Sequence, residues 1–163
     1  MSYGTKTLGV LLGLLFLTAS SGFASQVEVS EGTLMLTSSY IIAGSVIAEH
    51  SYWDSAHELI YTDYTVKVAE SLKGNLASSE VKVTVLGGVV GEIKLVVTEQ
   101  PVFQVGEKVL LYLEKPADGK VQLTCGSQGK YTIVNGVIKE TGEKIETFKS
   151  RLRTTLDQTP REE

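Results

Sequence analysis

Cysteine is almost absent from this 163-residue sequence, which contains only Cys125. One cysteine cannot form a disulfide within the chain, so stability has to come from a packed hydrophobic core. Because no histidine stands beside it in the sequence, we interpret Cys125 as a small buried hydrophobe rather than a nucleophile. Clusters of basic residues are also missing, and the formal net charge is −4. This acidic balance argues against nucleic acid and anionic lipid as partners.

The sequence has no apolar run long enough to cross a membrane, which takes about 20 residues. The run Leu8–Leu17 is about half that length. Lys6 precedes it, and Gly22-Phe23-Ala24 places small residues before a potential cleavage site after Ala24. This pattern predicts a cleavable secretory signal peptide in residues 1–24. No cysteine stands near the cut, which excludes a bacterial lipoprotein anchor.

We therefore expect an exported protein, secreted or held in the periplasm or cell envelope, with no stable membrane anchor after cleavage. The length that remains suits one domain, and neither a repeat nor a low-complexity linker divides it. The predicted organisation is a signal peptide in residues 1–24, a single β-barrel domain with a C-terminal helix in residues 25–157, and a disordered tail in residues 158–163.

Alternation of apolar and polar residues dominates the chain after the signal peptide. It is clearest over residues 60–69 and returns over residues 81–85, as expected of half-buried β-strands. Asn135-Gly136 predicts a two-residue hairpin turn, because both residues tolerate the positive φ angles that this turn needs. Pro116-Ala117-Asp118-Gly119 predicts a second hairpin. About seven short strands indicate a small antiparallel barrel or sandwich.

One helix is expected after the strands. Four apolar residues recur at spacings of three and four and would share one helix face: Ile145, Phe148, Leu152 and Leu156. Thr141 would cap the start of this helix, which we expect to pack across the barrel or to cover an open end. The predicted fold class is therefore all-β with one C-terminal helix, built on a small antiparallel barrel.

Several segments of the strand-rich region carry a family resemblance. They are Ile42-Ala43-Gly44-Ser45-Val46, Trp53-Asp54, Ile60-Tyr61-Thr62, Val68 through Leu72-Lys73-Gly74, Gly87-Gly88, Phe103 with Gly106-Glu107, Val109 to Leu113, and Gly129-Lys130-Tyr131. In this order they resemble an exported prokaryotic β-domain family that has no assigned activity. They are also similar to netrin-type modules and tissue inhibitors of metalloproteinases. The resemblance implies an OB-like, netrin-like barrel and, for function, an inhibitor or accessory partner of an exported protease.

Motifs for particular mechanisms are missing. Animal metalloproteinase inhibitors reach the catalytic zinc with a disulfide-held amino-terminal cysteine, whereas this mature chain would begin at Ser25 or Gln26. The glycine-rich stretch Gly87–Gly91 has β-like segments on both sides and no following Lys-Ser or Lys-Thr, so it is not a phosphate-binding loop. No Gly-x-Ser-x-Gly elbow is present, which argues against a serine hydrolase.

The two histidines of the chain stand close together in the sequence, among acidic residues. If His50 and His57 face each other across a hairpin, they and the oxygens of Asp54 and Glu58 form a plausible zinc set. However, the spacing matches no helix-borne zinc signature and lacks the second histidine of a metalloprotease motif. The alternative is a solvated polar loop around Trp53 with no cofactor.

Three aromatic residues are expected in loops: Tyr52, Trp53 and Phe103. Exposed loop aromatics often anchor protein interfaces, although the same residues would also serve to plug the ends of the barrel. The leading hypothesis is an exported, non-enzymatic module that binds another exported protein or an envelope component. A metal-binding protein or enzyme using the region from His50 to Glu58, and a structural envelope component, remain alternatives.

Overall fold

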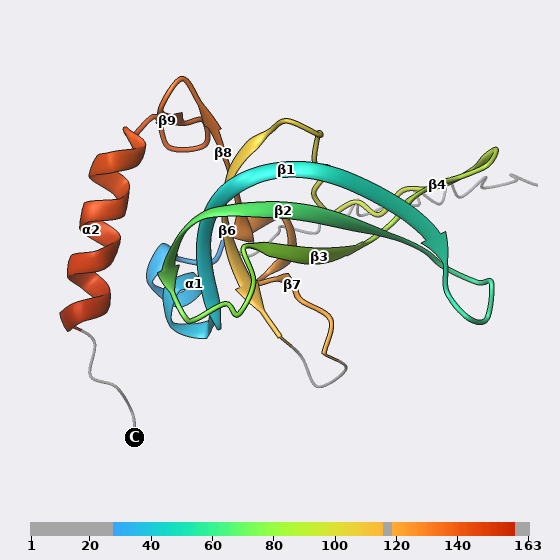
Figure 1. The fold of residues 1–163 in the computed structure, drawn as a ribbon, viewed down its shortest axis with the longest axis horizontal. Helices are drawn as coiled ribbons and strands as arrows, with labels where there is room; N and C mark the ends of the chain where they lie inside the picture. Colours follow the sequence, from blue (N-terminus) through green and yellow to red (C-terminus); the bar gives the residue numbers. More distant parts are fainter. Residues whose placement is uncertain (1–27, 116–118, 159–163) are drawn as a thin grey trace, which may run out of the picture.

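The computed structural model describes residues 28–115 and 119–158 (Figure 1). The predicted signal peptide, most of the turn predicted at residues 116–119 and the residues after 158 lie outside these ranges. The elements in chain order are α1 (Glu31–Thr37), β1 (Tyr40–Trp53), β2 (Ile60–Lys73), β3 (Glu80–Leu86), β4 (Gly88–Val90), β5 (Ile93–Leu95), β6 (Lys108–Glu114), β7 (Gln122–Leu123), a 3₁₀ turn (Gly126–Gly129), β8 (Lys130–Val134), β9 (Val137–Ile138) and α2 (Ile145–Gln158).

Seven strands form one sheet in the order β3-β2-β1-β6-β8-β9, with β7 paired to the C-terminal end of β6. The strand β6 lies in the middle and is buried from Val109 to Leu113. Val109, Leu111 and Leu113 pack into a core on one face of the sheet. Leu110 and Tyr112 pack into a second core on the other face. This continuous apolar run therefore marks a strand that is covered on both sides.

The sheet is not closed into a barrel. Within the described residues, β3 forms a single parallel bridge with the residue before β7, from Val83 to Val121, where the Thr84 N–H donates to the Val121 carbonyl oxygen over 2.9 Å. The strand β7 has only 2 residues and is too short to extend this contact into a ladder. The prediction of an all-β fold with one C-terminal helix is confirmed, but the sheet that was expected to form a small barrel does not close.

Both predicted hairpins pair the strands that they were expected to join. Asn135 and Gly136 have φ angles of 51° and 76°, and they connect β8 to β9 with Val134 opposite Val137. The strands β6 and β7 on either side of residues 116–119 pair antiparallel. Local turn chemistry thus fixes which neighbouring strands meet.

The short helix α1 was not predicted from the sequence. The Ser30 hydroxyl accepts the Thr33 N–H at its start, and the Lys73 ammonium donates to the carbonyl oxygens of Met35 and Leu36 at its end. Burial of the Lys73 ammonium lowers its pKa. A helix of 7 residues is too short to show a repeating apolar pattern, so packing and capping define it.

The C-terminal helix α2 forms as predicted and packs on the sheet. Ile145, Phe148 and Leu152 are buried, in the same core as Leu110 and Tyr112. The helix therefore covers one face of the sheet, together with α1, instead of an open barrel end. The Thr141 hydroxyl accepts the Glu143 N–H over 3.3 Å, ahead of the helix, so it orders the preceding turn.

The strands β1, β2 and β3 continue beyond the end of β6 as a long three-stranded ribbon (Figure 1). The ladder between β1 and β6 stops at Ser45 and Lys108, whereas β1 and β2 stay paired as far as Trp53 and Ile60. The β4–β5 hairpin reaches toward the same end of the molecule. No helix in the described part of the chain is both long enough and apolar enough to cross a membrane.

Candidate functional site

The residues expected to bind metal or partners lie mostly on this ribbon. His50 and Tyr52 stack on one face of β1 with their ring centroids 5.9 Å apart, and Tyr61 continues the stack 6.3 Å from Tyr52. The Tyr52 hydroxyl donates to Asp63 over 3.3 Å, and the Thr84 hydroxyl donates to the same oxygen over 2.7 Å. Burial and the adjacent Asp63 carboxylate raise the pKa of Tyr52. These cross-strand contacts stabilise the ribbon.

Asp54 stabilises the turn at the tip of the ribbon, between β1 and β2. Its carboxylate accepts the backbone N–H groups of Glu58 and Leu59 over 2.8 and 3.2 Å, and these bonds lower the pKa of Asp54. Trp53 stacks on His57 with ring centroids 6.2 Å apart. Asp54 thus acts as the acceptor that orders a turn.

The structure does not bring the four predicted zinc ligands together. Successive side chains of a strand point to opposite faces, and His50 stacks on Tyr52 whereas His57 stacks on Trp53. The two imidazoles therefore lie on opposite faces of the ribbon. In the described ranges, no group of three or more His, Cys, Asp or Glu side chains is placed to hold a metal ion.

Two other expectations concern burial. Phe103 is only 2 % exposed and packs on Tyr64 with ring centroids 4.7 Å apart. Its ring is part of the core and is not available as an interface anchor, so of the two sequence interpretations the interior one fits. The expectation for Cys125 is wrong, because this residue is exposed, with a φ of 56°, just before the 3₁₀ turn.

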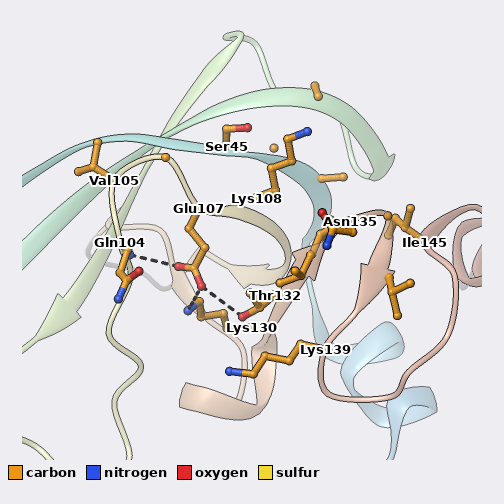
Figure 2. Close-up of a pocket in the computed structure, with 18 of the residues that line it drawn as sticks. Ser45, Gln104, Val105, Glu107, Lys108, Lys130, Thr132, Asn135, Lys139 and Ile145 are labelled. Carbon is orange, nitrogen blue, oxygen red and sulfur yellow. Dashed lines mark hydrogen bonds and ion pairs between the residues drawn. The ribbon is translucent and has the colours of Figure 1, made fainter.

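An open groove of about 1410 Å³ lies between the loop before β6, the β8–β9 hairpin and the start of α2 (Figure 2). Small side chains of Ala43, Ser45 and Ala69 line part of it. Val102 and Val105, which are 76 % and 57 % exposed, supply apolar surface from the loop. The groove therefore combines apolar contact area with room for an extended chain.

Glu107 holds one side of the groove in place. Its carboxylate accepts the Gln104 N–H over 3.1 Å, the Thr132 hydroxyl over 3.2 Å and the Lys130 ammonium over 2.9 Å (Figure 2). Lys130 also donates to the Val102 carbonyl oxygen over 3.0 Å. The side chains of Glu107 and Lys130 are 15 % and 11 % exposed. This shielded, charge-assisted network joins the loop to β8.

Four of the described residues that line the groove are lysines, and they fall into two pairs. Lys130 and Lys149 are engaged within the protein, the latter with Glu70 over 2.9 Å and Glu146 over 3.1 Å. Lys108 and Lys139 are exposed, and their ammonium groups make no hydrogen bond or ion pair within the described residues. The groove therefore presents two ammonium groups that are available to a ligand.

The sequence points to none of these groove residues as a site. Gly106-Glu107 and Gly129-Lys130-Tyr131 are among the segments that carry the family resemblance, and the structure joins them through the Glu107–Lys130 ion pair. The two residues are 23 positions apart, and the strand pairing that brings them together is not visible in a local pattern. The segments that carry the family resemblance were the only feature of the sequence that pointed to this part of the molecule.

Comparison of the chain with models of known protein families and with curated proteins gives no match. The geometry of the groove is therefore the basis for a functional proposal.

Proposed function

We propose that this protein is an exported, non-enzymatic binding module whose groove holds a segment of another exported protein or envelope component. The observation that carries the proposal is the groove itself. It is open, it is bordered by a loop that the Glu107 network holds in place, and it presents two lysines whose ammonium groups have no partner among the described residues. A preorganised site loses less freedom when it binds.

The size and lining of the groove favour a chain segment over a compact small molecule. Pockets for small ligands enclose about 300–1,000 Å³ and cover most of the ligand surface, whereas this groove is open and measures about 1410 Å³. Apolar side chains along one side and ammonium groups near them match the mixed surface of an extended polypeptide.

The more specific proposal is an accessory partner or inhibitor of an exported protease. It rests on the resemblance to netrin-type modules and protease inhibitors. The β1–β2–β3 meander, with β6 on the other side of β1 and β7 reaching back to β3, supports it because a partly open Greek-key barrel is expected of such modules. The zinc alternative has no comparable support, since its ligands are separated on the ribbon.

Site-specific photocrosslinking tests the proposal. A benzophenone amino acid would replace Gln104, an exposed groove residue, and in a matched control would replace Lys94, an exposed residue of β5 outside the groove. We expect the Gln104 variant to crosslink one discrete protein from the exported fraction of the producing cell, and the Lys94 variant not to. Equal products from both positions, or none from Gln104 in a folded variant, would contradict the proposal.

A further inference from the structure

We infer that the segment held in the groove is acidic, and that Lys108 and Lys139 bind its carboxylates. This inference rests on the proposed function and adds the chemistry of the ligand. It follows from which lysines of the groove already have partners and which do not.

The charge of the groove differs from that of the chain. The whole sequence has 15 basic and 19 acidic residues, yet the described residues that line the groove include four lysines and one acid, Glu107. The Glu107 carboxylate already accepts three hydrogen bonds, one of them from Lys130. Glu107 balances Lys130, and Glu70 and Glu146 balance Lys149, so the positive charge left in the groove is that of Lys108 and Lys139.

Acidic residues around the groove bind partners other than Lys108 and Lys139. Glu70 and Glu146 pair with Lys149, and Glu140 accepts the Thr132 backbone N–H over 2.9 Å. None of these three carboxylates bonds to Lys108 or Lys139 among the contacts of the described residues. The two ammonium groups are consequently open to carboxylates from another molecule.

The positions of the two lysines suit an extended ligand. Lys108 is the first residue of β6, and Lys139 follows β9 directly. Figure 2 shows them on either side of Thr132, with the Lys108 side chain pointing toward β1 and the Lys139 side chain pointing the other way, both within the lining of the groove. A segment that crosses the groove would place acidic side chains near both, and its apolar side chains near Val105. Charge complementarity of this kind raises specificity and the rate of association.

Synthetic peptides provide a direct test. Three fluorescein-labelled peptides of about ten residues would alternate valine with glutamate, glutamine or lysine, and binding would be followed by fluorescence polarisation. We expect the glutamate peptide to bind most tightly, and its affinity to fall as salt is raised, because exposed charges are screened. The lysine peptide should bind least.

Two double variants separate the groove from general charge effects. K108Q/K139Q should weaken the glutamate peptide about three- to tenfold, as expected when two exposed ion pairs are lost, and leave the glutamine peptide unchanged. The matched control K67Q/K94Q removes the same charge from exposed positions outside the groove and should leave the affinity for the glutamate peptide within about twofold. Circular dichroism would confirm that all variants are folded.

The outcomes distinguish this inference from the proposed function. The inference of an acidic ligand would be overturned by any of three results. These are equal binding of the three peptides, no binding of the glutamate peptide at about 1 mM, or equal losses of affinity in the two double variants. If the Gln104 crosslink then persists, the binding function stands and the ligand chemistry is wrong. If that crosslink is also absent, both proposals are wrong.

Discussion

The buried hydroxyl of Tyr112 provides a sharp test of the described core. Tyr112 is 0 % exposed, and its hydroxyl has no hydrogen-bond partner within the described residues. The ring itself is well packed, with an edge-on contact to Tyr131 at a centroid distance of 5.7 Å. Replacing Tyr112 with phenylalanine removes the unpaired oxygen and keeps the ring contacts. We therefore expect Y112F to be more stable than the wild type.

The magnitude follows from the cost of burying a polar group. A buried donor or acceptor without a partner costs about 1–3 kcal/mol, so Y112F should raise the free energy of unfolding by about 1 kcal/mol or more. This corresponds to an increase in Tm of about 3–5 °C for a domain of this size. Urea denaturation followed by circular dichroism measures the change. Y112F should shift the midpoint without changing the slope.

The same residue predicts a dependence on alkaline pH. Burial raises the pKa of the Tyr112 phenol far above the usual value of 10.0. Between these two pKa values the unfolded state loses the proton first, so stability is full below pH 10 and falls as the pH rises. The loss is about 1.4 kcal/mol per pH unit for one such group, and Y112F should remove it.

Two comparisons make the result interpretable. Y131F changes a half-buried tyrosine in the same core and should alter stability by less than about 0.5 kcal/mol. F148A removes a fully buried ring and should cost about 3–5 kcal/mol, which verifies that the assay responds to this core. If Y112F instead destabilises the protein by about 1 kcal/mol, the hydroxyl has a partner and the reasoning is refuted.

The other predictions concern the ribbon and the groove. G88A should cost about 2–3 kcal/mol in urea denaturation, because a Cβ at φ 141° would collide with the Thr62 hydroxyl oxygen; an unchanged midpoint would contradict the described packing. D54A should destabilise the β1–β2 hairpin, which would be detected as faster amide hydrogen exchange at its tip. D54N keeps a hydrogen-bond acceptor and should change the exchange rate little. The pKa of Asp54 is lowered in the folded protein. Its contribution to the stability of the hairpin should therefore be full above the usual carboxyl pKa, and should be lost as the pH falls through the lowered pKa of the folded state. E107A should cost about 2–3 kcal/mol by leaving Lys130 without its anion, whereas the matched variant E92A, at an exposed glutamate outside the groove, should be neutral.

Sequence patterns predicted the parts of the fold that depend on local chemistry. The alternation over residues 60–69 matches β2, and Asn135-Gly136 forms the expected turn. The spacing of Ile145, Phe148 and Leu152 placed the buried face of α2 correctly. Each of these signals involves residues within a few positions of one another, so burial and turn geometry can be predicted from the local sequence.

Features that depend on distant contacts were not predictable in the same way. The open sheet results from the shortness of β7, which the alternating apolar and polar residues over 121–124 do not reveal. His50 and His57 looked like a pair because they are close in sequence, but strand alternation and ring stacking place them on opposite faces. The Glu107–Lys130 contact requires β6 and β8 to pair, and only the sheet register shows it.

The two kinds of lysine in the groove explain why binding and stability should respond to different substitutions. Lys130 is shielded and bonded to Glu107, so its loss would disturb the loop before β6. Lys108 and Lys139 are exposed, and even an ideal exposed ion pair contributes only about 0.2–1 kcal/mol to stability. An acidic residue placed beside Lys108 or Lys139 would therefore stabilise the fold little. It would also neutralise a positive charge that a ligand can bind. K108Q/K139Q should thus lower affinity for the glutamate peptide at unchanged Tm, whereas E107A should lower Tm.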